Sequence, residues 1–397
     1  AGRRLLRRRH TVERLAKIRG GLIDLGLDAV LITDELNQRY AAGFAFTDGA
    51  VLVTLDRAFL LTDSRYIEAA EKSVSGDITV RMFGAGKRLS QLVREAMDEC
   101  GVKMLGAEEF SLSHGAYLNW QRVLGVELHP CQSLFYRLRA SKDESEIRSM
   151  RRAQAIAEQA LDDVLGIIRP GITERDIAAE ISYRMLKHGG EGNSFDPIAV
   201  TGANSSMPHG VPSDAVVCEG DFITMDFGCI KDGYCSDMTR TVAVGMPSDE
   251  MRSVYQIVLN AQLAGIAAAK AGVTGERVDG AARKVISDAG YGAYFGHSFG
   301  HGVGVEIHES PNASPANAQP LPAGAVISAE PGIYLPGIKY KYLGVFTANP
   351  FHNAPYMAAR PFAILAFFKY GELLSVYEQK NAWKEHGRDY ILFALYL

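Results

Sequence analysis

The order of apolar and polar positions changes period several times along the first third of the chain. Residues 12–25 place apolar side chains three or four positions apart, which predicts an amphipathic helix. Residues 28–33 form a short, mostly apolar run typical of a buried strand, and residues 49–61 resemble two strands joined by a tight turn. Helices that alternate with strands in this way favour an α/β domain, which we place at residues 11–138.

Residues 141–337 interleave helical periods with short extended runs, which predicts a second, α+β domain with a curved antiparallel sheet. Four residues whose side chains can cap a helix stand before the helical periods: Ser141, Thr173, Ser248 and Thr274. Ser141 and Thr173 each have an acidic residue three positions later, which is the spacing of a capping box. Four extended runs lie between the helices: 215–217, 222–227, 238–244 and 326–329.

The second and third of these runs are predicted to form one hairpin, joined over Asp232-Gly233, a dipeptide suited to positive φ angles. In that register Asp226 lies opposite Thr239, and Asp237 lies diagonally beside Asp226 on the same face. Two carboxylates between apolar residues repel each other and are poorly solvated unless a cation lies between them. The alternative is a pair of surface aspartates, although aspartate is depleted from strand interiors.

Further candidate ligands lie later in the chain. His297, His301 and His308 fall close together, and glycines flank His301, where the backbone can approach a ligand or metal closely. Glu330 ends an apolar run just before a Pro-Gly turn. His209, between prolines and a glycine, fits either a rigid turn or an imidazole positioned for a substrate. Carboxylates with one imidazole suit Mn²⁺, Co²⁺, Zn²⁺ or Fe²⁺, and the set indicates a metal-dependent hydrolase.

The composition sets limits on size, partners and location. At 397 residues the chain exceeds the usual size of one core, and its 47% apolar and 22% charged fractions are ordinary for a globular protein. A net charge of −4 argues against nucleic acid as a partner, and the basic residues 3–9 are expected to form a solvated tail. The sequence contains no apolar run of membrane-spanning length. Five cysteines without a CxxC spacing favour reduced thiols and a cytoplasmic location.

In this order the motifs resemble those of the metallopeptidase family of Xaa-Pro aminopeptidases, prolidases and methionine aminopeptidases, whose catalytic domain has the pita-bread fold. The resemblance runs from about residue 11 to residue 336. Tyr40-Ala-Ala-Gly-Phe44 and Leu61-Thr-Asp-Ser-Arg-Tyr66 resemble the N-terminal domain that the proline-specific members share with creatinase. The resemblance is therefore closest to the proline-specific branch. It implies proline-containing peptides as substrates, a homodimer, and two divalent ions, either Mn, Co or Zn.

The resemblance also implies a set of metal ligands. Asp226 would bind one ion, Asp237 would bridge both ions, and His301 and Glu330 would bind the second ion. Glu330 is in addition the expected proton shuttle of the reaction. Creatinase, which has the same fold, works without metal and lacks this carboxylate set.

Three histidines have implied roles beside the metal ligands. His209 and His308 correspond to histidines that contact the substrate and stabilise the transition state, and His297 corresponds to one that lines the pocket. Two other functions stay open at this point. One is a catalytically inactive binding protein on the same fold, and the other is metal-free amidinohydrolase chemistry, which the acidic ligands disfavour.

The family pattern breaks after about Gly337. The family carries a second bridging glutamate in a strand after the Glu-Pro-Gly turn, but here the first acidic residue after Glu330 is Glu372. Residues 338–397 are also visibly richer in aromatic residues than the whole chain, of which 9% is aromatic. We favour a frameshift or a misassembled gene end as the explanation, and a divergent tail is the alternative.

The missing glutamate has consequences for the site. Asp237, His301 and Glu330 are expected to hold one ion well, with an open position for water. The other ion would keep only Asp226 and the shared Asp237, so its affinity and the activity of the chain are expected to be reduced. The missing strand is also expected to leave a sheet edge uncovered.

Overall fold

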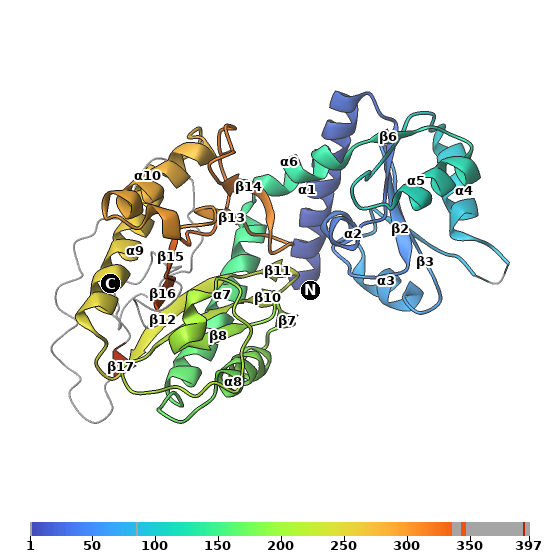
Figure 1. Cartoon of the computed structure of the whole chain (residues 1–397). Coiled ribbons are helices and arrows are strands. Elements are labelled where there is room, and N and C mark those ends of the chain that lie inside the picture. Colours follow the sequence, from blue (N-terminus) through green and yellow to red (C-terminus); the bar gives the residue numbers. More distant parts are fainter. Residues whose placement is uncertain (1, 85, 336–342, 347–391, 394–397) are drawn as a thin grey trace. The chain divides into compact units, whose positions relative to one another are not determined.

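The computed structural model describes residues 2–84, 86–335, 343–346 and 392–393 (Figure 1). The chain divides into two compact units, Ala1–Arg139 and Ala140–Leu397. Each unit builds its own apolar cores.

A mixed six-stranded sheet forms the centre of the first unit. Its strands are β1 (Ala29–Ile32), β2 (Gly49–Thr54), β3 (Ala58–Thr62), β4 (Thr79–Met82), β5 (Leu105–Ala107) and β6 (Leu128–Pro130). They are hydrogen-bonded in the order β4-β3-β2-β1-β5-β6. β2 runs antiparallel to β1 and β3, whereas the pairs β3–β4, β1–β5 and β5–β6 are parallel. The hairpin of β2 and β3 is the one that the sequence predicts.

Six helices belong to this unit, and helices cover both faces of its sheet. They are α1 (Gly2–Leu25), α2 (Glu35–Ala42), α3 (Ile67–Ser73), α4 (Leu89–Cys100), α5 (His114–Leu124) and α6 (Gln132–Ala140). In β1, Val30 and Ile32 belong to a core shared with α1 and α6, while Ala29 and Leu31 belong to a core shared with α4 and α5. The strand is therefore buried on both faces, which explains its wholly apolar sequence. The predicted α/β domain is confirmed.

The helix predicted at residues 12–25 begins much earlier than expected. α1 starts at Gly2, so the basic residues 3–9, which were expected to form a solvated tail, are helical. Arginine and leucine are among the better helix formers. The run can therefore extend a helix that is anchored further along, where Leu15, Ile18 and Leu22 are buried.

In its described residues the second unit combines four long helices with short antiparallel sheets, as the predicted α+β class requires. The helices are α7 (Glu144–Leu165), α8 (Glu174–Lys187), α9 (Asp249–Ala268) and α10 (Gly275–Asp288), with the 3₁₀ turns η1 (Gly202–Ser206) and η2 (Gly292–Tyr294). The strands are β7 (Gly192–Asn193), β8 (Ile198–Thr201), β9 (Phe222–Phe227), β10 (Cys229–Lys231), β11 (Tyr234–Cys235), β12 (Met238–Val244), β13 (Gly300–Gly302), β14 (Glu309–Ala313), β15 (Gly332–Leu335), β16 (Leu343–Phe346) and β17 (Leu392–Phe393).

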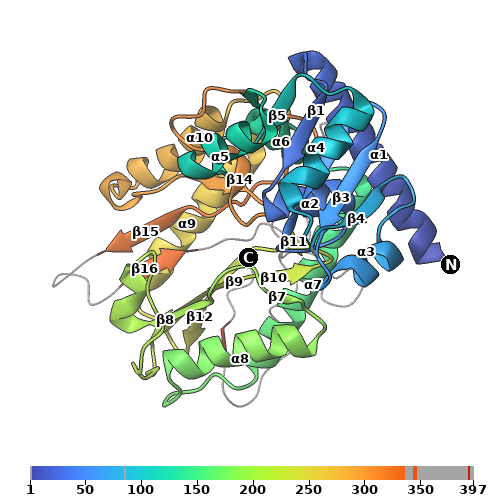
Figure 2. The same cartoon turned by 90° about the vertical axis from the view of Figure 1, so that its right-hand side faces the viewer.

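Each pair of helices in this unit packs against different strands. α7 and α8 share a core with β9 and β12, whose sheet runs β17-β12-β9-β8, and Figure 2 shows α8 alongside these strands. α9 and α10 pack together and share a core with Phe299, Ile327 and Ile333. The candidate ligands lie on segments that belong to these two cores. Asp226 and Asp237 lie on the hairpin of β9 and β12, and His301 and Glu330 lie on the chain from β13 to β15.

Three of the four predicted helix caps are confirmed, and one is displaced. Thr173, Ser248 and Thr274 each accept a hydrogen bond from a backbone amide in the first turn of α8, α9 and α10, respectively. The cap of α7 is Asp143 with Glu146 rather than Ser141 with Glu144. Both pairs have the same spacing, and a tertiary contact decides between them, because the Ser141 hydroxyl donates to the Ala323 carbonyl oxygen.

Two of the four predicted extended runs are strands and two are single bridges. β9 and β12 match the predicted runs 222–227 and 238–244. The other two runs make one bridge each, Val216 with Thr173 and Ile327 with Gly302.

The expectation of an uncovered sheet edge is wrong at β15. β16 pairs with β15 from Leu335 opposite Leu343 to Gly332 opposite Phe346. β17 likewise extends the edge of β12. Strand pairing uses backbone groups, so it does not need the side-chain pattern that the tail lacks. The remainder of the predicted tail, 338–397, lies outside the described residues. None of the helices within the described residues combines the length and apolar composition of a membrane-spanning helix.

A buried carboxylate connects the end of β1 to α2 in the first unit. Glu108 Oε2 accepts hydrogen bonds from the backbone amides of Thr33 (2.6 Å) and Asp34 (2.9 Å), and Oε1 accepts one from Asn37 Nδ2 (2.8 Å). Asn37 Oδ1 in turn accepts from the buried Arg139. Burial raises the pKa of Glu108 to about 7, although its hydrogen bonds favour the charged form.

The pKa of Glu108 is higher in the folded chain than in the unfolded one. Its favourable contribution to the free energy of unfolding is therefore complete below pH ~4.5 and is lost as pH rises through about 7. We expect the stability of the wild type relative to Glu108→Gln to fall between pH ~5 and ~8, by at most about 3 kcal/mol. Urea unfolding of the two proteins across this range measures the difference. Glu127→Gln, at an exposed position, is the control and should show no such trend. A pH-independent difference for Glu108→Gln would contradict the prediction.

Candidate active site

The hairpin of β9 and β12 positions the two aspartates as predicted from the sequence. Asp226 pairs with Thr239, and the turn is formed by Asp232 (φ 50°) and Gly233 (φ 77°). Asp237 directly precedes β12 and is buried. Both aspartates therefore lie on one short stretch of paired backbone, whose flanking residues are mostly buried.

Backbone and hydroxyl contacts hold His301 and Glu330 side by side. The Glu330 amide donates to the Phe299 carbonyl oxygen (2.8 Å), and the Ser328 amide donates to that of His301 (2.7 Å). The Ser328 hydroxyl accepts from the His301 amide (2.9 Å) and donates to Glu330 Oε1 (2.9 Å). Residues far apart in sequence are thus fixed by paired main chain, and one serine connects both candidate ligands.

The glycines around His301 serve packing of the protein backbone. A Cβ at Gly300 would lie 2.0 Å from the Ser328 carbonyl oxygen, and one at Gly302 would lie 2.3 Å from the Glu309 carbonyl oxygen. The glycines were expected to let a ligand or metal approach the backbone, but in the structure it is other backbone that approaches them. Larger residues would push β13 away from Ser328 and Glu309.

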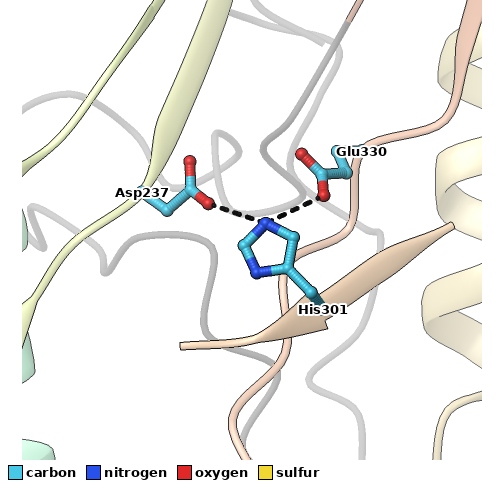
Figure 3. Close-up of side chains that lie close together, drawn as sticks. All are labelled: Asp237, His301 and Glu330. Atoms are coloured by element: carbon cyan, nitrogen blue, oxygen red, sulfur yellow. Dashed lines mark ion pairs between the residues drawn. The ribbon is translucent and has the colours of Figure 1, made fainter. Parts of the chain in front are cut away.

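Asp237, His301 and Glu330 converge on one point (Figure 3). His301 Nε2 lies 3.4 Å from Asp237 Oδ2 and 3.2 Å from Glu330 Oε1, so the imidazole nitrogen faces both carboxylates. The potential ligand atoms of the three residues all lie within 4.8 Å of one another. Asp226 stands outside this group, but its charge interacts with those of Asp237 and Glu330.

Burial and mutual repulsion shift the ionisation of the two aspartates. Burial, followed by the charges of Asp237 and Glu330, raises the pKa of Asp226 well above its ordinary value. Burial and the charge of Glu330 raise the pKa of Asp237 to about 7. The ionised form of each carboxylate is therefore unfavourable in this site without a neighbouring positive charge.

His301 and Glu330 shift in the complementary sense. Burial opposes protonation of His301, but the carboxylates of Glu330 and Asp237 outweigh it and raise the pKa of His301 to about 10. Burial also acts to raise the pKa of Glu330, but the charge and hydrogen bond of His301 outweigh it and lower that pKa. In the metal-free chain, protonated His301 supplies positive charge where a cation would otherwise supply it.

The residues present fit a divalent metal ion. His301 Nδ1 donates to the Gly302 carbonyl oxygen (3.0 Å), which leaves Nε2 as the ligand atom directed at the two carboxylates. Asp226 Oδ1 is buried and has no hydrogen-bond partner among the described residues. An unsatisfied buried carboxylate oxygen beside this cluster is what a cation would stabilise.

The three other predicted histidines gather near the cluster. The rings of His301 and His308 lie 4.2 Å apart between centroids. Burial lowers the pKa values of His297 and His308, and the charge of the exposed His209 lowers both further, so all three interact electrostatically. The structure therefore brings His308 against His301, while His297 and His209 interact with the site through their charges.

Sequence reasoning missed three residues that support His297. Its Nδ1 donates to the Ser298 carbonyl oxygen, so Nε2 accepts the hydrogen bond from the Tyr334 hydroxyl (3.0 Å). Arg283 donates to the carbonyl oxygens of Phe295 and His297 and is held by Asp279. Asp279 and Arg283 are four residues apart on α10, a spacing that is common for ion pairs on the surface of any helix and so does not indicate a site. Of the three residues only Tyr334, four positions after Glu330, lies near a motif that the sequence analysis singles out.

Comparison with known proteins agrees with this geometry. Residues 148–351 match the model of metallopeptidase family M24, and residues 14–141 match the creatinase/prolidase N-terminal domain. The chain is 41% identical over 340 residues to the uncharacterised peptidase YqhT of Bacillus subtilis, covering 85% of this chain and 96% of that protein.

Solved structures show the same likeness. The Xaa-Pro dipeptidase of Bacillus anthracis is 40% identical with a TM-score of 0.79, and the match covers 85% of this chain and 94% of that one. The X-Pro aminopeptidase of Thermotoga maritima is 38% identical with a TM-score of 0.77, covering 82% and 92%.

Fold and site together define a metallohydrolase with a carboxylate-rich centre. The chain belongs to metallopeptidase family M24 and carries the creatinase/prolidase N-terminal domain. It is thus an enzyme, a metallopeptidase similar to Xaa-Pro dipeptidases and aminopeptidases, and the family implies divalent metal ions.

The charge balance of the site predicts how the chain responds to metal. Mn²⁺ or Co²⁺ is expected to raise the Tm near neutral pH, because binding to the folded chain alone stabilises it. Asp237→Asn should lose most of this increase and, without metal, should be at least as stable as the wild type, since a repelled buried charge is removed. Thermal unfolding with and without metal measures both effects.

Asp232→Asn is the matched control on the same hairpin. Asp232 is exposed, and its φ of 50° is one that asparagine tolerates, so the metal-dependent increase should remain. Retention of the full increase in Asp237→Asn would show that the metal binds elsewhere, and an equal loss in both variants would show that the loss is not specific to Asp237.

Proposed function

We propose that the chain hydrolyses the peptide bond before a proline, releasing the N-terminal residue from Xaa-Pro peptides or dipeptides. The observation that carries the proposal is the convergence of Asp237, His301 and Glu330, with Asp226 beside them. The names of the similar structures support the substrate class, and they divide between dipeptidase and aminopeptidase, so they favour neither.

Divalent ions, either Mn, Co or Zn, would be held by Asp226, Asp237, His301 and Glu330. When bound they supply an activated water and stabilise developing negative charge. Glu330 is the proposed proton shuttle. The Ser328 hydroxyl donates to its Oε1, which orients the carboxylate, while Oε2 is left to take up and release the proton.

The histidines complete the proposed machinery on the substrate side. His209 and His308 are largely exposed residues near the cluster. Partial burial and the charge of His301 lower the pKa of His308, which favours a neutral ring that can donate a hydrogen bond to a peptide carbonyl. Both ring nitrogens of His297 are engaged, by Ser298 and Tyr334, so we assign it to shaping the pocket wall.

The chain offers fewer ligands than two ions need. The family match continues past Gly337 to residue 351, yet no acidic residue lies between Glu330 and Glu372. We therefore propose one ion held firmly by Asp237, His301 and Glu330, and a second held weakly. A frameshift remains our proposed origin for the tail, and the nucleotide sequence around Gly337 tests it.

The missing ligand also supports the rival reading of a catalytically inactive binding protein on the same fold. Metal content separates the two readings, because an inactive binder needs no bound ion. A homodimer and a cytoplasmic location complete the proposal, from the family resemblance and the cysteine usage, respectively. Light scattering of the purified chain tests the dimer.

The activity is tested with Xaa-Pro peptides in the presence of Mn²⁺ or Co²⁺. We expect release of the N-terminal residue from Ala-Pro peptides and little release from Ala-Ala peptides. Asp237→Asn should lower kcat/KM on the order of 1,000-fold, because it removes a ligand needed throughout the reaction. Asp232→Asn should leave kcat/KM unchanged. Activity that persists both after the metal is removed with a chelator and in Asp237→Asn would contradict the metal mechanism.

A further inference from the structure

Lys142 and Glu309 form the most deeply buried ion pair in the described part of the chain. Lys142 Nζ lies 2.7 Å from Glu309 Oε1, and the two side chains are only 1% and 2% exposed. Neither residue belongs to the candidate metal ligands or to the histidines around them. Removing two opposite charges from water is costly, so this pair calls for a physical reason.

The carboxylate of Glu309 lies inside the loop that joins the two strands of the β13–β14 pair. Glu309 directly follows His308 and pairs with Gly302, the neighbour of His301. A Cβ at Gly304 would lie 2.1 Å from Glu309 Oε1, so the loop closes around the carboxylate only with glycine there. The Glu306 amide points at Oε2 from 3.4 Å. One side chain thus contacts the loop that connects His301 with His308.

The same loop is attached to the metal-binding part of the unit. The Cys235 amide donates to the Gly304 carbonyl oxygen (2.7 Å), close to Asp237, and the Val303 amide donates to that of Val326 (3.2 Å). At the end of the loop, the His308 ring lies against the His301 ring. A shift of the loop would therefore move His308 relative to the cluster.

Lys142 is itself held in place before α7. Its amide donates to the Gly324 carbonyl oxygen (2.9 Å), and the neighbouring Ser141 hydroxyl donates to that of Ala323 (2.7 Å). The ammonium group therefore approaches Glu309 from a fixed segment of backbone.

Stability alone does not explain the pair. Replacing a buried ion pair by apolar residues of similar volume is often neutral or stabilising, whereas removing one partner leaves an uncompensated charge. A charged contact differs from an apolar one in specifying direction and distance. We propose that Lys142 and Glu309 are positioning residues that fix loop 303–308 and so set His308 against the metal-binding cluster. The part of this proposal that concerns catalysis rests on the proposed function.

The key variant is the double substitution Lys142→Met/Glu309→Leu, which replaces the pair by apolar side chains. It is compared with the wild type and with Glu309→Gln, which leaves the ammonium uncompensated. Lys284→Met is the matched control, because Lys284 pairs with Asp288 on α10 with both side chains more than half exposed. Each protein is measured by thermal unfolding, by amide hydrogen exchange of peptides covering 303–308, and by Xaa-Pro hydrolysis with metal.

We expect the double variant to keep the Tm of the wild type while its 303–308 amides exchange at least about tenfold faster and exchange elsewhere in the unit stays unchanged. Its kcat should fall roughly 100-fold with little change in KM, since a group is misplaced rather than a binding surface removed. Glu309→Gln should in addition lower the Tm, and Lys284→Met should match the wild type throughout.

Unchanged exchange at 303–308 in the double variant would overturn the proposal, as would faster exchange spread evenly over the unit. Faster local exchange with an unchanged kcat would overturn the link to His308. If the double variant does not fold, Glu309→Gln is judged by the same criteria. If the wild type is inactive, the proposed function fails, and hydrogen exchange still decides whether the pair fixes the loop.

Discussion

The structure of the second unit depends on a balance of charge among three buried or half-buried carboxylates and one imidazole. Asp226, Asp237 and Glu330 lie close enough to alter one another's ionisation, and His301 faces two of them. A folded chain can keep such a group only if positive charge is present, either as a proton on His301 or as a bound cation. Either source of positive charge satisfies the fold, whereas the proposed chemistry needs the cation.

Close packing of backbone around that group leaves little freedom for sequence change. Gly300, Gly302 and Gly304 each stand where a Cβ would meet a carbonyl oxygen or a carboxylate. These contacts bring β13 against the Ser328–Glu330 segment and β14, so that ligands from separate segments reach one point. The glycine-rich motif around His301 is therefore explained by protein packing, and ligand access is not needed to account for it.

The two described segments after residue 335 extend sheets but contain no acidic residue. β16 pairs with β15, so the sheet continues although no acidic residue follows Glu330 before Glu372. Pairing needs only backbone amides and carbonyls, whereas metal ligation needs a carboxylate at one position. The strand pairing of the described residues is therefore independent of whether the chain supplies the further ligand that the family resemblance implies.

The sequence by itself determined the strand register and most helix caps, and it predicted seven candidate site residues. Asp232-Gly233 defines the turn, and side-chain alternation then decides which residues share a face, so Asp226 and Asp237 could be paired from local rules. Tertiary structure decided between alternatives that the local sequence leaves equal, such as two possible caps for one helix. Asp143 rather than Ser141 caps α7, because the Ser141 hydroxyl donates to the Ala323 carbonyl oxygen instead. The roles of four further residues depend on partners distant in sequence: Arg283, Tyr334, Lys142 and Glu309. Local rules act through the backbone of neighbouring residues, whereas a buried polar group is defined by whatever the fold packs against it.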